Sequence, residues 1–219
     1  TGASGNDTIT GGAGADTING LDGNDGIDGG GGNDELSGGA GDDTFTIDAG
    51  TDTISDLATG DVFTVGVGAA VVADVSGSFT ATNATQNRGG ANTDARIDAD
   101  IGATGVDMSL ANVANAATDG FRILMGPIAT GTYTGSVGDD IIDASGNING
   151  VTIIGGAGAD DMDGSNADPD DGFVSNDVFI IAEAAPHAAG EDIDGRDGTD
   201  TIRFTSTTAN ETLTLNAGV

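Results

Sequence analysis

Residues 2–64 read GASGNDTIT, GGAGADTIN, GLDGNDGID, GGGGNDELS, GGAGDDTFT, IDAGTDTIS and DLATGDVFT, seven units of nine without an insertion or a deletion. The sixth position of every unit is aspartate: Asp7, Asp16, Asp25, Asp34, Asp43, Asp52 and Asp61. The eighth position is always a large apolar residue: Ile9, Ile18, Ile27, Leu36, Phe45, Ile54 and Phe63. A fixed period of this kind indicates supersecondary units that stack on one another.

Each unit combines a turn with a short strand. The glycines of the first four positions allow positive φ in a tight turn, and the last three residues alternate as a strand does. Two units make one coil, so that units i and i+2 stack at the ~4.8 Å spacing of neighbouring strands. This stacking sorts the aspartates into two rows, one with Asp7, Asp25, Asp43 and Asp61, and the other with Asp16, Asp34 and Asp52.

The two rows of carboxylates predict bound cations. Carboxylates ~4.8 Å apart repel by about 3 to 4 kcal/mol at an effective dielectric constant near 20, and a divalent cation between them reverses the sign. The ligands on offer are carboxylates and backbone carbonyls, which suit Ca²⁺ better than Mg²⁺ or a transition metal. The candidate carbonyls belong to Gly12, Gly14, Gly30, Gly32, Gly39 and Gly41. We infer that this stretch is disordered without calcium and folds when it binds the metal.

The composition excludes several classes of partner. The chain has 36 acidic residues against five arginines, and a net charge of -31. Such a charge repels nucleic acid and anionic membrane surfaces. Cysteine is absent, which rules out disulfides and thiolate metal sites. No apolar run reaches the ~18 residues of a membrane helix, so we expect no membrane insertion. The chain starts without a basic and apolar leader, and we expect any targeting signal to have been removed or to lie outside this segment.

The nine-residue register is lost after residue 64 and returns at residue 135. Residues 65–134 predict an irregular β-rich segment, with continuation of the coil as one option. Residues 135–219 predict a second, interrupted repeat block, with residues 1–64 as the first. Its candidate metal ligands are Asp140, Asp160, Asp177 and Asp200, with carbonyls from Gly156 and Gly158. We expect Asn149 at a metal position, Val151 at a core position, and a site between Asp140 and Asp160. PHAAGEDID places Glu191 at a further metal position.

Two other features of the sequence bear on metal binding and catalysis. The insertion GSNADPDDG, residues 164–172, alternates Asn166, Asp168 and Asp170 as an EF-hand loop does, but it lacks the glutamate at position 12. An extra calcium site and a solvated acidic loop both remain open there. The single histidine, His187, has no neighbouring nucleophile and is expected to be a loop residue. No catalytic motif is present, so we expect that the chain is not an enzyme.

The nonapeptide resembles G-G-x-G-x-D-x-U-x, with U apolar, of the RTX calcium-binding family. The resemblance implies an all-β, calcium-stabilised parallel β-roll or β-helix, here with an irregular central segment, and several Ca²⁺ ions. It also implies a protein that bacteria secrete, usually through a type I system, and that folds outside the cell. The chain is similar to repeat segments of bacterial surface-layer (S-layer) proteins and giant secreted adhesins.

Three functions remain open within this resemblance. The favoured one is a structural module on the bacterial cell surface, whose partners are calcium and either copies of itself in a lattice or filament, or surface polysaccharide. The second is the secretion and folding domain of a type I-secreted hydrolase or toxin. The third is a carbohydrate-binding module, which the single tyrosine, the single histidine and the absence of tryptophan disfavour.

Overall fold

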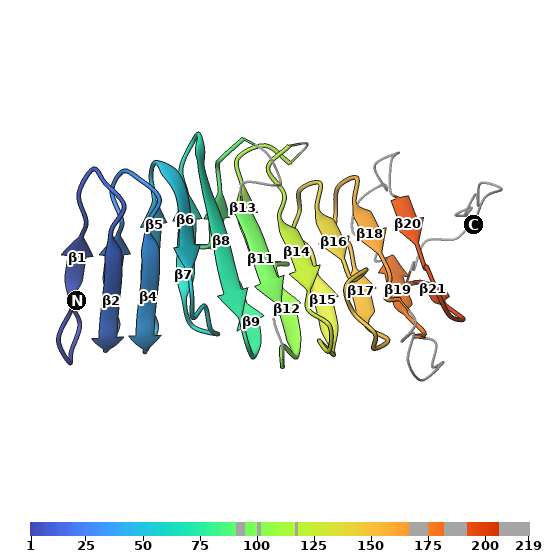
Figure 1. The fold of residues 1–219 in the computed structure, drawn as a ribbon. Helices are drawn as coiled ribbons and strands as arrows, with labels where there is room; N and C mark the ends of the chain where they lie inside the picture. The colour runs from blue at the N-terminus through green and yellow to red at the C-terminus, as the bar shows by residue number, and fades with distance from the viewer. Residues whose placement is uncertain (91–94, 100–101, 117, 167–174, 182–191, 206–219) are drawn as a thin grey trace.

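The computed structural model describes residues 1–90, 95–99, 102–116, 118–166, 175–181 and 192–205. These residues form strands and turns, with no helix among them. Figure 1 shows the coils stacked side by side along one axis, from β1 near the N-terminus to β21 near the C-terminus. All strand pairs in the three sheets are parallel, which defines a β-solenoid.

The strands alternate between sheets as the chain coils. Sheet 1 holds β1 (Thr8–Thr10), β3 (Gly26–Asp28), β5 (Thr44–Ile47), β7 (Val62–Val65), β10 (Gln86–Asn87) and β13 (Asn112–Val113). Sheet 2 holds β2 (Thr17–Asp22), β4 (Glu35–Ala40), β6 (Gly50–Ile54), β8 (Ala69–Val75), β11 (Ala95–Ala99), β14 (Arg122–Met125), β16 (Ile141–Asp143), β18 (Asp161–Asp163) and β20 (Asp192–Asp194). Sheet 3 holds β9 (Ser78–Thr80), β12 (Gly105–Asp107), β15 (Thr132–Thr134), β17 (Thr152–Ile154), β19 (Val178–Ile181) and β21 (Thr201–Phe204).

The first block, β1 to β7, is a two-sided roll. Ile9 pairs with Ile27, and Ile27 pairs with Phe45, so the apolar eighth positions form an inner column between sheets 1 and 2. Ile18 and Leu36 form the facing column. These pairs join residues 18 positions apart, so the predicted stacking of alternate units is confirmed. Side chains alternate along each strand, and the eighth-position side chains therefore all point inward.

The roll widens where its glycines end. Ile47 and Leu57, which replace turn glycines, are buried in the core, and Ile47 pairs with Val65. From β7 to β15 each coil visits three sheets, and from β14 onward the chain returns to two, sheets 2 and 3. Sheet 2 alone runs unbroken from β2 to β20, so the central segment joins the two repeat blocks through one continuous sheet.

A single apolar core fills the solenoid. Its widest part holds Phe63, whose ring centroid lies 6.2 Å from those of both Phe79 and Phe121. Tyr133 is also fully buried there. The all-β parallel solenoid with an irregular central segment, predicted from the sequence, is confirmed. None of the described residues belongs to a helix long and apolar enough to cross a membrane.

Two positions in the second block differ from the prediction. Val151 and not Asn149 lies opposite Asp177, and Ile153 is the core residue that pairs with Phe179. The sequence prediction placed the metal position at Asn149 and the core position at Val151, each two residues too early. The turn before β17 is longer than the turn of a standard unit. Gly164 and Ser165 contact the Asp177 carboxylate as the first and second positions of a unit do, although eleven residues lie between Ser165 and Asp177 where a standard unit has three.

Candidate metal centre

The aspartates of the sixth position, here called ladder aspartates, are joined by a repeating hydrogen bond. The backbone N–H of Asp7 donates to Asp25 Oδ1 at 2.8 Å, that of Asp25 to Asp43 Oδ1 at 2.8 Å, and that of Asp43 to Asp61 Oδ1 at 2.9 Å. On the other edge Asp16 donates to Asp34 Oδ1 at 2.9 Å, and Asp34 to Asp52 Oδ1 at 3.0 Å. Both predicted rows therefore exist. One oxygen of each acceptor is engaged by the backbone, and the other is left for a different partner.

The second oxygens of the interior ladder aspartates have no protein partner. Oδ2 of Asp25, Asp34, Asp43 and Asp52 is buried, and no hydrogen-bond donor reaches it from any described residue. A buried carboxylate oxygen without a partner costs several kcal/mol, on the order of the desolvation penalty of a charged group. Stacked in rows, these oxygens fit a divalent cation, whose charge would offset both their burial and their mutual repulsion.

The glycine at the first position leaves room for its own ladder aspartate. A methyl group on Gly20, Gly29 or Gly38 would collide with Oδ2 of the aspartate five residues later. The same holds for Gly155 and Gly195, which face Asp160 and Asp200. The repeat therefore needs glycine here for space around the carboxylate, and not only for turn conformation.

The residue at the second position takes one of two conformations. In what we call open turns, its φ is positive: Leu21 at 85°, Gly30 at 87°, Gly39 at 97°, Gly156 at 110° and Arg196 at 59°. The N–H of this residue then points away from the ladder aspartate. That of Gly30, for example, donates to Asp28 Oδ1 at 2.9 Å, and that of Arg196 to Asp194 Oδ1 at 3.0 Å.

In closed turns the second residue instead donates its N–H to Oδ2 of the ladder aspartate. Ala3 donates to Asp7 at 2.6 Å and Gly12 to Asp16 at 2.7 Å, both in the first coil. Ser136 donates to Asp140 at 2.6 Å, and Ser165 to Asp177 at 2.8 Å. The backbone thus decides whether the second carboxylate oxygen is satisfied by the protein.

The glycines predicted to supply carbonyl ligands stack closely on the coil before them. The α-carbon of Gly30 lies against the carbonyl of Gly12, that of Gly32 against Gly14, and that of Gly39 against Leu21. Gly41, Gly156 and Gly158 lie in the same way against Gly23, Ser136 and Gly138. Within the described residues no three acidic or histidine side chains converge on one point, so carbonyls are needed to complete a calcium shell. Their role as ligands, like that of each ladder aspartate, stays a prediction.

Burial sets the protonation of several ladder aspartates. It raises the pKa of Asp52 and of Asp61 to about 6, against the opposing effect of a backbone hydrogen bond, and the adjacent ladder carboxylate adds to the rise. The pKa of Asp43 is raised for the same reasons. Burial raises the pKa of Asp140 to about 8. Without a cation, therefore, these carboxyl groups keep their protons to a higher pH than an exposed aspartate does.

The second block places its four ladder aspartates on two different edges. Asp140 donates its N–H to Asp160 Oδ1 at 3.0 Å on the edge that leads into sheet 2. Asp177 donates to Asp200 Oδ1 at 3.0 Å on the edge that leads into sheet 3. A stacked pair at Asp140 and Asp160 matches the prediction of neighbouring rungs. The predictions for Asp168, Asp170, His187 and Glu191 concern positions outside the described residues.

A second ladder at the fifth position was missed by the sequence reasoning. Oδ1 of Asn6 accepts the N–H of Asn24 at 2.9 Å, and Oδ1 of Asn24 accepts that of Asp42 at 3.2 Å. Asn33 accepts from Thr51 at 3.0 Å, and Asn176 from Thr199 at 2.7 Å. Four of the first seven units carry asparagine or aspartate at this position, which is the signal that could have found it.

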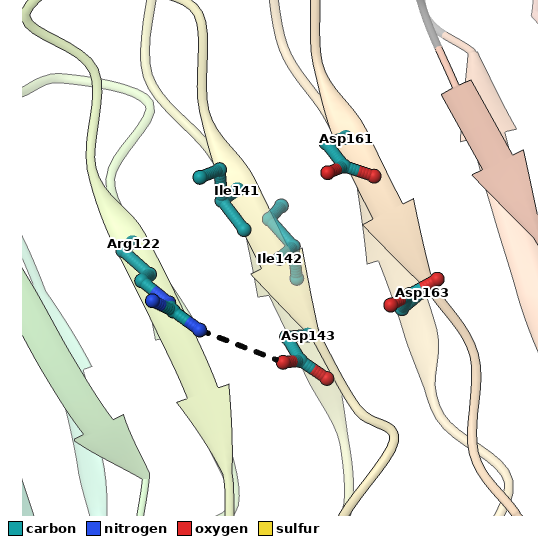
Figure 2. Close-up of a pocket in the computed structure, with 6 residues that line it drawn as sticks. All are labelled: Arg122, Ile141, Ile142, Asp143, Asp161 and Asp163. Atoms are coloured by element: carbon teal, nitrogen blue, oxygen red, sulfur yellow. Dashed lines mark ion pairs between the residues drawn. The ribbon is translucent and has the colours of Figure 1, made fainter. Parts of the chain in front are cut away.

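The outer face of sheet 2 carries a shallow acidic pocket, shown in Figure 2. Arg122 of β14 forms an ion pair with Asp143 of β16 at 3.8 Å, and Asp161 and Asp163 of β18 line the other side. Burial and the carboxylates of Asp163 and Asp192 raise the pKa of Asp161. Asp163 also forms an ion pair with Arg196 at 2.6 Å. These contacts balance charge on the sheet face.

A parallel β-solenoid whose edges stack buried carboxylates in pairs belongs to the class of metal-stabilised repeat proteins. The family model of the RTX calcium-binding nonapeptide repeat matches residues 1–36, 27–54 and 151–168, in four copies. No curated protein matches the chain. Residues 1–54 and 151–168 therefore contain RTX repeats, these repeats bind several Ca²⁺ ions, and the chain is a calcium-binding structural module.

Proposed function

We propose that this chain is a structural module of a secreted bacterial cell-surface protein, of the S-layer or adhesin kind, which folds on binding calcium outside the cell. The observation that carries the proposal is sheet 2, which runs unbroken from β2 to β20 and makes one continuous solenoid of both repeat blocks. A long module of this kind suits a spacer or lattice element. RTX repeat proteins are typically secreted, which supports the location.

The charge of the chain supports folding after export. With a net charge of -31, self-repulsion keeps the metal-free chain extended, and calcium removes part of that repulsion on binding. Extracellular calcium modules commonly have dissociation constants of about 10⁻⁴ to 10⁻³ M, far above cytosolic calcium. The N-terminal roll would then stay unfolded until it leaves the cell.

The proposal includes the expectation that the chain is not an enzyme. The pocket of Figure 2 is lined by arginine, isoleucine and aspartate, and a second pocket is lined by Ala15, Asp16, Thr17, Asn33, Asp34, Glu35, Thr51 and Thr53.

Immunolabelling of intact producing cells, with and without a chelator wash, tests the location. A surface module should label intact cells, and the label should fall when calcium is removed. A calcium titration of purified protein, followed by far-UV circular dichroism and light scattering, tests folding and self-assembly together. A protein found only in the medium, joined to a catalytic domain and monomeric in millimolar calcium, would favour the secretion-domain function instead.

A further inference from the structure

Two serines distinguish the second repeat block from the first. Ser136 occupies the second position of its turn, and its hydroxyl lies 3.1 Å from both carboxylate oxygens of Asp140. Ser165 occupies the same position before Asp177, and its hydroxyl lies 3.0 Å from Asp177 Oδ1 and 2.6 Å from the Asn149 carbonyl. Both serines are buried.

With these hydroxyls, both oxygens of the two aspartates are satisfied by the protein. Asp140 Oδ1 also accepts the N–H of Phe121 at 2.5 Å, and Oδ2 that of Ser136 at 2.6 Å. Asp177 receives the equivalent pair from Val151 and Ser165, both at 2.8 Å. In the first block, by contrast, Oδ2 of four ladder aspartates has no donor among the described residues. The Ser165 hydroxyl has one proton and shares it between Asp177 and the Asn149 carbonyl. A carboxylate whose two oxygens both have donors needs a cation less than one with an oxygen that has none.

The central segment also lacks the feature that makes the first block depend on metal. Along sheet 2, Asp52 is followed by Val71, and Val71 by Ala95, in the same register. Phe121 comes next, immediately before β14, and precedes Asp140 in the stack. Three successive rungs therefore place apolar, fully buried side chains where the first block has carboxylates. No charge repulsion opposes their stacking.

We propose that calcium organises the N-terminal roll, whereas the coils from β7 to β17, and β19 that pairs with β17, keep their fold without it. At Asp140 and Asp177 the backbone N–H groups of Ser136 and Ser165, together with their hydroxyls, stabilise the carboxylates that calcium stabilises in the first block. The metal-independent coils then form a preformed end onto which the roll winds when calcium arrives. This inference rests on the calcium-dependent folding of the roll put forward above.

Hydrogen exchange of the whole chain, read by mass spectrometry in calcium and in chelator, tests the division. In chelator, amides of β2 and β4 should exchange at the rate of an unfolded chain, while those of β8, β11 and β14 stay protected. If β8, β11 and β14 lose protection together with β2 and β4, the division is wrong although calcium-dependent folding holds. If β2 and β4 stay protected in chelator, calcium-dependent folding of the roll is wrong, and the inference falls with it.

Replacing the serines tests their part. Ser136→Gly with Ser165→Gly restores the glycine of the repeat and removes both hydroxyls. In chelator, β16 and β19 should then exchange about tenfold faster or more than in the original chain, the effect of losing a hydrogen bond to a charged group, and calcium should restore them. Ser109→Gly, at an exposed turn serine, is the matched control and should change neither strand. Unchanged exchange of β16 and β19 in the double variant would overturn the role of the serines.

Discussion

Leu21 shows at the scale of one residue what an open turn costs. It adopts a φ of 85°, in the left-handed region that glycine occupies in the equivalent turns at Gly30 and Gly39. A side chain with a β-carbon loses roughly 1 to 2 kcal/mol in that region. The leucine is 41% exposed, so little core packing compensates. The turn keeps its open conformation against a local preference, because the stacked neighbours on either side determine it.

Replacing Leu21 by glycine should therefore stabilise the calcium-loaded protein by about 1 kcal/mol, through relief of this strain. Urea unfolding in excess calcium measures the change. Val137→Gly is the matched control, since Val137 is 48% exposed in a turn and has no positive φ. The control should gain nothing. A Leu21→Gly variant no more stable than the control would show that the left-handed turn is not strained.

The ladder aspartates give the metal-free protein an inverted pH dependence. Burial raises the pKa of Asp52 and Asp61 from 3.8 to about 6, so the folded state holds these protons more tightly than the unfolded state. The stability that protonation contributes is fully present below pH 3.8 and is lost as the pH rises through about 6. The metal-free roll, which is unfolded at pH 7, should therefore gain strand content as the pH falls to 4, and far-UV circular dichroism of metal-stripped protein measures this gain.

Calcium should reverse this trend, because protons and calcium compete for the same carboxylates. Lowering the pH from 7 to 5 should then weaken calcium binding, which a calorimetric titration at both values measures. A metal-free protein that becomes more stable from pH 4 to pH 7 would contradict the raised pKa values.

Within one repeat unit, the conformation of the turn and the position of the ladder aspartate before the strand depend on each other, because the first-position glycine packs against that aspartate. Gly29 packs its α-carbon against its own ladder aspartate, and an added methyl group would also lie 3.0 Å from Asp34 Cβ. Either the carboxylate or the turn must then move, and both are fixed by the neighbouring coils through Asp16 and Asp52. The glycine and the aspartate of a unit therefore act as one structural feature.

Gly29→Ala should lower calcium affinity and destabilise the roll by about 2 kcal/mol or more, the typical effect of overpacking a fixed site. Gly14→Ala is the matched control, because an added methyl group there meets nothing within 4 Å. The calcium midpoint of the circular dichroism signal measures both. Equal midpoints for the two alanine variants would mean that the first glycine serves only the turn.

The same dependence explains which elements the sequence could predict. In residues 2–64 the period fixes both the strand and its ladder aspartate, so β1 to β7 and both rows of aspartates follow from it. The period does not reveal that Ile47 and Leu57 enter the core and widen the coil, since their burial depends on residues far along the chain. Val151 was misplaced by two residues, and the insertion at residues 164–172 was recognised without showing that Gly164 and Ser165 contact Asp177, because a nine-residue count does not locate an insertion within a unit.

For the whole molecule, the continuity of sheet 2 joins regions of different chemistry into one body. Two-sided coils with stacked carboxylates lie at one end, and three-sided coils with an aromatic core lie in the middle. The acidic character of the molecule could be predicted from its composition. The continuity of sheet 2 could not be predicted from the sequence. Paired residues of β6, β8, β11 and β14 are separated by a different number of residues in each coil, so no fixed period reveals the pairing.

The parallel pairing of the coils has a mechanical consequence. Backbone hydrogen bonds between coils run along the solenoid axis, so tension between the two ends loads one coil boundary at a time and peels the coils off in succession. Corresponding ladder aspartates are 18 residues apart, and each coil that detaches from the roll would add about 60 Å of extended chain. Optical tweezers should record a staircase of such extensions, at higher force in calcium than in chelator. A tether built in this way would lengthen under load without failing at once, and a single rupture of the entire chain would exclude that behaviour.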